Sequence, residues 1–196
     1  QYLKQNEIIS IKKVLNDNNS NISLRNKAIV TLLLYTGLRG CDICNLKLND
    51  IDWENEIIHI IQSKTSVPLE LPLTKTIGNS ICNYLLYERP KVNIPNIFIR
   101  EDANYPITRS SIELAIRKVM NEANVRMNAG ERRGSHIFRH NIAVTLLEHE
   151  VAQPIITETL GHTSPKTLEI YLNADISHLK QCALSIEDFP YMEVQS

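Results

Sequence analysis

The stretch SLRNKAIVTLLLYTGLRGCDICNL, residues 23–46, decides the first helices of the fold. Ser23 is a residue type favoured at a helix N-cap, and apolar residues follow it at helical spacing. Gly37 is the residue type that ends helices in the left-handed conformation, so we expect this helix to stop there. Arg39 follows directly, before a short second helix expected over residues 41–46, and its side chain is expected to reach out of the packed layer.

The rest of the chain adds more helices and one β-rich segment. Residues 57–61 and 67–73 are β-branched or apolar and predict an antiparallel hairpin with Lys64 at or near its turn. Pro68 and Pro72 restrict its second strand to a sheet edge. Further helices are expected over residues 6–16, from Thr74 to before Pro90, from Thr108 or Ser110, over 136–148 and 154–160, from Pro165 towards Tyr171, and over 176–184. The expected fold is mainly α with a small antiparallel β-sheet, in a single domain over residues 1–196.

Length and composition narrow the class of protein. The chain has 196 residues, 43% of them hydrophobic, which suits one globular domain. Its apolar runs fall far short of the roughly 20 residues of a membrane span, so we expect no membrane partner, and no secretory signal opens the chain. Four Cys without a regular framework favour a reducing compartment, so a cytoplasmic location is expected. The start at Gln1 suggests a fragment of a longer protein.

Charge is unevenly distributed along the chain. The net charge is -1, but residues 1–108 carry +1, residues 109–139 carry +4 and residues 140–196 carry -6. Binding to phosphates needs a local positive surface and not a positive whole. A basic middle segment is compatible with a DNA groove, and equally with a solvated charged face.

The pentapeptide HIFRH, residues 136–140, contains two histidines and one arginine. On a helix, His136, Arg139 and His140 share one face because they are three and four residues apart. A solvated or internally bonded helix start would explain this pattern alone as well as a functional site.

Metal binding fits these residues poorly. The zinc motif H-E-x-x-H needs Glu where this chain has Ile137. Cys41 and Cys44 lack a second pair of ligands, because Cys82 and Cys182 lie far apart. We expect no metal site and no cofactor.

Four motifs in order give a more specific signal. They are TGLR at 36–39 with Asp42 and Ile43 following, HIFRH at 136–140, LGHTS at 160–164, and Tyr171 nine residues after His162. Together they resemble the tyrosine recombinase (phage integrase) family over residues 6–180. The resemblance implies the tyrosine recombinase catalytic domain, a DNA breaking-rejoining enzyme fold that works without metal.

The resemblance also implies roles for individual residues. Tyr171 would be the nucleophile that attacks the scissile phosphodiester, giving a 3′-phosphotyrosyl intermediate and a free 5′-hydroxyl, with strand exchange through a Holliday junction. The other catalytic positions would be the two phosphate-binding arginines, two histidines and a lysine that protonates the leaving oxygen: Arg39, Arg139, His136, His162 and Lys64. Lys75 lies near Lys64 in the sequence, so the choice of catalytic lysine between the two stays open.

Supporting positions follow from the same resemblance. Asp42 would orient Arg39 or a neighbouring backbone group, and His140 would brace the site. Arg132 and Arg133 precede the HIFRH helix and suit contacts to the DNA backbone, or a solvated loop.

Partners are implied as well. The substrate would be double-stranded DNA at recombination sites, bound by a homotetramer, with accessory DNA-bending proteins in some systems. The free fragment would be a monomer or weak oligomer that lacks the family's N-terminal DNA-binding domain. Residues 175–196, a helix and tail, would dock on a neighbouring protomer or pack on their own domain.

Two other functions stay open: a catalytically inactive DNA-binding or regulatory relative, and a type IB topoisomerase-like strand transferase. Among the other tyrosines, Tyr35 and Tyr84 lie on apolar helical faces and are expected in the core.

Overall fold

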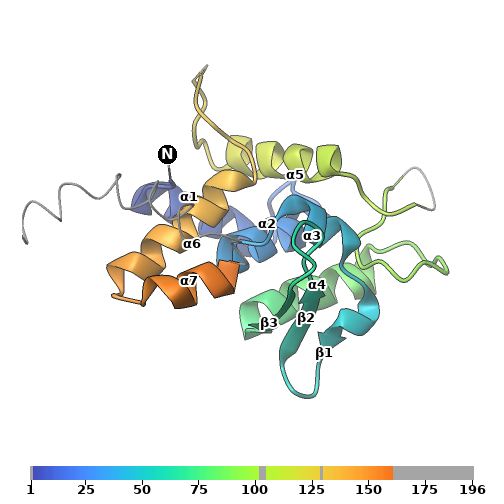
Figure 1. Cartoon of the computed structure of the whole chain (residues 1–196). Coiled ribbons are helices and arrows are strands. Elements are labelled where there is room, and N and C mark those ends of the chain that lie inside the picture. The colour runs from blue at the N-terminus through green and yellow to red at the C-terminus, as the bar shows by residue number, and fades with distance from the viewer. Residues whose placement is uncertain (1, 102–104, 129, 161–196) are drawn as a thin grey trace, which may run out of the picture.

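The computed structural model describes residues 2–101, 105–128 and 130–160 (Figure 1). Within them the fold is mainly helical with one small sheet, as the sequence predicts. The elements in chain order are α1 (Gln5–Asn16), α2 (Leu24–Thr36), α3 (Gly40–Asn45), a 3₁₀ turn (Leu48–Asp50), β1 (Ile51–Asp52), β2 (Ile57–Ile61), β3 (Pro68–Pro72), α4 (Lys75–Tyr87), α5 (Arg109–Glu122), α6 (His136–Glu148) and α7 (Gln153–Leu160). No helix in these ranges is both long enough and apolar enough to cross a membrane.

Helix α2 is the centre of the fold. Every side chain from residue 26 to residue 34 is buried, and α1, α3, α4, α5 and α6 all contact this helix. Ser23 caps its first turn by accepting a hydrogen bond from the Asn26 N–H, and Gly37 ends it in the left-handed conformation, both as predicted. The buried Lys27 ammonium donates to the Asp17 carbonyl at 2.6 Å, which compensates for its burial.

The sheet has three antiparallel strands in the order β1-β2-β3. Ile58 pairs with Leu71 and Ile60 with Leu69, so the inward face of β2 packs on the core. β3 is an edge strand, as its two prolines predict, and Lys64 lies in the turn between β2 and β3. Strand β1 was not predicted, because two residues are too short for an alternating pattern.

The later helices agree with the sequence pattern. Thr74 and Thr108 cap α4 and α5 with their hydroxyls, and α7 ends at Leu160. Tyr84 is buried as expected, and its hydroxyl accepts a hydrogen bond from the Ile99 N–H. The expectation for Tyr35 is wrong: it is 38% exposed, because the last turn of α2 reaches the surface, where the Lys12 ammonium lies 5.2 Å from its ring centroid.

A second, smaller apolar cluster joins α6 to α7. Ala143, Ile156 and Leu160 are buried in it, with Ile142 and Leu146 packed against them. In Figure 1 these two helices lie on the left of α2, and the sheet lies below and to the right. The position of α7 therefore depends on α6.

Glu88 should be a strong determinant of stability, because its carboxylate accepts hydrogen bonds from the Leu24 N–H at 2.5 Å and the Arg25 N–H at 3.3 Å, at the start of α2. Glu88→Ala should lower the free energy of unfolding by about 1–2 kcal/mol, and Glu88→Gln by less, because one amide oxygen remains to accept. Urea denaturation measures this. Exposed Glu54→Ala is the control and should stay within about 0.5 kcal/mol; equal losses for Glu54 and Glu88 would contradict the capping role.

Candidate active site

The turn that ends α2 brings Arg39 beside α6. Gly37 has φ of 64°, and a Cβ there would lie 3.3 Å from Ile142 and 3.4 Å from the Cα of Arg139. Glycine is required here for two reasons: the left-handed backbone and the close approach of α6. The TGLR and HIFRH motifs, about 100 residues apart in sequence, therefore meet at this point.

Arg139 is the buried arginine of the site, with 7% of its surface exposed. Its Nη1 donates to the Gly37 carbonyl at 3.1 Å, and its Nη2 donates to the carbonyl of Leu160, the last residue of α7. These bonds compensate for the desolvation of the guanidinium. They also join α6 to the turn that carries Arg39 and to the end of α7.

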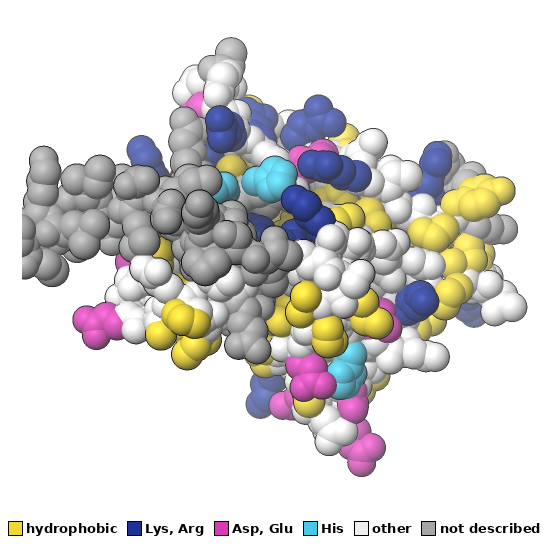
Figure 2. Space-filling view, in the orientation of Figure 1, with side chains coloured by type: hydrophobic (Ala, Val, Ile, Leu, Met, Phe, Trp, Pro, Cys, Tyr) yellow, Lys and Arg dark blue, Asp and Glu magenta, His cyan; other side chains and the backbone are white. Residues whose placement is uncertain are grey.

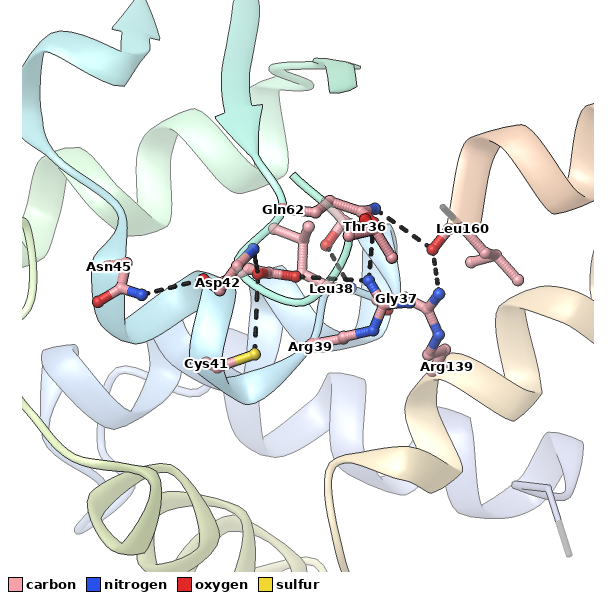
Figure 3. A network of polar contacts seen from close by, with 12 residues as sticks. Thr36, Gly37, Leu38, Arg39, Cys41, Asp42, Asn45, Gln62, Arg139 and Leu160 are labelled. Atoms are coloured by element: carbon pink, nitrogen blue, oxygen red, sulfur yellow. Dashed lines mark hydrogen bonds and ion pairs between the residues drawn. The ribbon is translucent and has the colours of Figure 1, made fainter. Parts of the chain in front are cut away.

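Arg39 approaches from the other side of the same turn. Its side chain is 17% exposed, its Nη1 donates to the Gln62 Oε1 at 2.7 Å, and the Asp42 Oδ2 lies 4.0 Å away. Figure 3 shows the side chains of Arg39 and Arg139 next to each other at Gly37. The structure thus brings together the two arginines that the sequence predicted as a pair.

Asp42 links this turn to the β2–β3 hairpin. It is 2% exposed, and its Oδ1 accepts a hydrogen bond from the Ser63 N–H at 2.8 Å. Asn45 adds a bond from its Nδ2 to the Ser63 Oγ at 3.0 Å. Of the two expected partners of Asp42, the backbone group donates a hydrogen bond to its carboxylate, and Arg39 lies at ion-pair distance.

Lys64 is exposed in the hairpin turn that Asp42 and Asn45 hold against α3. Lys75, the alternative lysine, is instead the first residue of α4. The assignment of Lys64 as the catalytic lysine stays a prediction.

Gln62 is a site residue that the sequence reasoning missed. Its side chain is 1% exposed and contacts Arg39, Thr65 and the carbonyl of Leu160. One signal was available: Ile58 and Ile60 face inward on β2, and the two-residue period of a strand puts residue 62 on the same face.

The start of α6 holds the two histidines of the HIFRH motif. His136 is exposed and His140 is half-buried. Burial lowers the pKa of His140, and the neighbouring positive charges add to the effect, so its neutral form is favoured near pH 7. Glu113 on α5 anchors this helix start, because its Oε1 accepts hydrogen bonds from the Ser135 hydroxyl and N–H.

Arg132 and Arg133 lie in the loop just before α6. Arg132 is exposed, and its carbonyl accepts a hydrogen bond from Arg126, which in turn pairs with Glu7 at 3.0 Å. Arg133 donates to the Asn121 side chain at 2.8 Å. Figure 2 shows Lys and Arg side chains gathered near His on the upper part of this face, with acidic side chains at its lower end. Contact of these arginines with DNA stays a prediction.

The described residues contain no group of three or more His, Cys, Asp or Glu side chains placed to hold a metal ion. Cys41, Cys44 and Cys82 are free thiols. Burial raises the pKa of Cys44 to about 11, with a further contribution from Cys41, so Cys44 stays protonated at neutral pH.

Three predicted features fall outside the described residues. His162 follows Leu160 by two positions, Tyr171 follows nine positions later, and the C-terminal segment 175–196 completes the chain. Of the residues predicted to be catalytic, Arg39, Lys64, His136 and Arg139 lie within the described part of the chain.

Known proteins resemble this chain over most of its length. The model of the phage integrase family matches residues 1–178. "Putative integrase/recombinase y4gC" of Sinorhizobium fredii is 34% identical over 99% of this chain and 98% of its own length. The tyrosine recombinase XerA of Pyrococcus horikoshii is 29% identical over 81% of this chain, which spans about half of that protein (54%).

Solved structures share the fold. A crystal structure of XerA recombinase superposes with a TM-score of 0.75 at 24% identity, covering 94% of this chain and 64% of that one. XerH recombinase bound to palindromic difH substrate, a post-cleavage complex, gives a TM-score of 0.76 at 23% identity, covering 96% and 54%. The fold is that of tyrosine recombinase catalytic domains, and the chain belongs to the phage integrase family.

Proposed function

We propose that this protein is a site-specific DNA recombinase in which Tyr171 attacks the scissile phosphodiester. The Tyr171 oxygen forms a bond to phosphorus, and the bond from phosphorus to the 5′ oxygen breaks. The products are a 3′-phosphotyrosyl DNA and a 5′-hydroxyl, and attack by the 5′-hydroxyl of a partner strand rejoins the DNA through a Holliday junction. A covalent link keeps the energy of the broken bond, which transfer to water would lose.

The observation that carries this proposal is the meeting of Arg39 and Arg139 at Gly37. Negative charge grows on the non-bridging oxygens of the phosphate as Tyr171 attacks. Guanidiniums bind such oxygens with paired N–H groups, which the point charge of a lysine does less well. Two fixed arginines therefore suit a phosphoryl-transfer transition state, and they supply the positive charge that a metal ion supplies in other enzymes.

Proton transfer completes the reaction. Lys64 in the hairpin turn would protonate the leaving 5′ oxygen, a step worth about 10²- to 10⁴-fold in rate. His136 and His162 would bind the phosphate or assist removal of the tyrosine proton, because an imidazole can donate or accept a hydrogen bond or a proton. His140 and Asp42 would support these groups.

The wider assembly belongs to the same proposal. Double-stranded DNA would be bound by four copies of the protein in the cytoplasm, with Arg132 and Arg133 contacting its backbone and accessory DNA-bending proteins present in some systems. Residues 1–196 would act as the catalytic domain. Residues 175–196 would dock on a neighbouring copy. DNA-bound recombinases among the structural relatives support DNA as the partner.

Covalent trapping tests the nucleophile. The protein is incubated in EDTA with a nicked suicide duplex from the junction of its own element, and a denaturing gel reports any protein–DNA adduct. Wild type should form a 3′-phosphotyrosyl adduct that the chelator does not reduce, and Tyr171→Phe should form none, because it lacks the hydroxyl.

Each alternative gives a different result in this assay. An adduct that persists in Tyr171→Phe would mean that another residue is the nucleophile. No adduct from wild type would favour the inactive DNA-binding relative. Relaxation of supercoiled plasmid without site preference would favour the topoisomerase-like function.

Arg139→Lys tests the paired arginines. The lysine keeps the charge but loses the planar fork that bonds Gly37 and Leu160. The single-turnover rate of adduct formation should fall by about 10²- to 10³-fold. Arg117→Lys, the same change at an exposed position on α5, should lose far less. A thermal melt of each variant separates loss of chemistry from loss of folding, and equal rates in both variants would refute the role of Arg139.

A further inference from the structure

Gln62 is a buried polar residue between exposed neighbours. It is 1% exposed, whereas Ile61 before it is 75% exposed and Ser63 after it is exposed. A carboxamide is costly to bury unless both its oxygen and its nitrogen find partners. We therefore expect hydrogen bonds to both ends of the Gln62 carboxamide at the start of the Lys64 turn.

The contacts of Gln62 join three separate segments (Figure 3). Its Oε1 accepts hydrogen bonds from the Arg39 Nη1 at 2.7 Å and the Thr65 hydroxyl at 2.8 Å. Its Nε2 donates to the Leu160 carbonyl at 3.3 Å, the same carbonyl that accepts from Arg139. One side chain thus touches the α2–α3 turn, the hairpin turn and the end of α7.

The backbone of Gln62 also closes the hairpin. Its N–H donates to the Val67 carbonyl at 3.0 Å, and its carbonyl accepts from the Ser66 N–H at 2.8 Å. Lys64 lies inside the loop that these bonds close. Movement of Gln62 would therefore shift the Lys64 turn relative to Arg39.

Only a group that both accepts and donates satisfies these partners. Arg39 and Thr65 offer donors, and the Leu160 carbonyl needs a donor. A methionine here would satisfy neither side. A glutamate would accept from Arg39 but would neutralise part of its charge and present an oxygen to the Leu160 carbonyl.

We infer that Gln62 is a positioning residue for DNA cleavage: it orients Arg39 towards the scissile phosphate and holds the Lys64 turn in register with the end of α7, two residues before His162. This inference rests on the proposed function. Gln62 acts through Arg39 and Lys64.

Two substitutions of similar size test the inference. Gln62→Met removes the hydrogen bonds, and Gln62→Glu keeps the acceptor but not the donor. At pH 7.5 both should lower the single-turnover cleavage rate by about 10- to 100-fold, because small displacements of catalytic groups have effects of this size. Affinity for the uncleaved duplex should change by less than about threefold, because phosphate contacts across the whole DNA surface dominate binding.

The pH profile separates positioning from general damage to the fold. A protonated glutamic acid regains one donor and one acceptor, the pattern of the carboxamide, and its ordinary pKa is about 4.3. The rate of Gln62→Glu relative to wild type should therefore rise as pH falls from 7.5 to about 4.5, where a sizeable fraction of such a carboxyl is protonated, whereas that of Gln62→Met should stay constant. Gln153→Met and Gln153→Glu, at an exposed site on α7, are matched controls and should follow wild type.

A second measurement needs no cleavage. Hydrogen exchange of the peptide covering residues 62–67 should be faster in Gln62→Met than in wild type or Gln153→Met. Unchanged exchange, or cleavage within threefold of wild type for both Gln62 variants at every pH, would overturn the inference. Wild type that forms no adduct would refute the proposed function instead, and the exchange result would still decide whether Gln62 holds the turn.

Discussion

The close approach of α6 to Gly37 is the contact on which the site depends. It sets the distance between two helices that are far apart in sequence, and it leaves the Gly37 carbonyl within reach of the Arg139 guanidinium. Any side chain at position 37 would meet Ile142 and would also strain the left-handed backbone. Because α7 packs on α6, the position of α7 up to Leu160 also depends on this contact.

Backbone carbonyls and a carboxamide are among the groups that hold the two arginines. Arg139 bonds two backbone carbonyls and Arg39 bonds a carboxamide, while the Asp42 carboxylate stays at 4.0 Å from Arg39 and accepts from a backbone N–H. A neutral hydrogen-bond acceptor orients a guanidinium and leaves its charge in place. A close ion pair would offset that charge.

Much of this was predictable from the sequence. Capping residues and Gly37 marked the ends of α2, and the motifs identified the arginine pair, because local chemistry defines both. Strand β1 was missed because two residues carry no period, and Tyr35 was placed in the core because an apolar face does not reveal where a helix meets the surface. Gln62 was missed because its role comes from contacts with segments 23 and 98 residues away, which no local pattern encodes.

The two edge strands of the sheet limit how copies of the chain can associate. β3 lacks backbone N–H groups at Pro68 and Pro72, and β1, on the opposite edge, is two residues long. An incoming strand from another molecule would therefore find few donors on one edge and little length on the other. Copies brought close together can associate through helices and loops, but the sheet is protected against edge-to-edge aggregation.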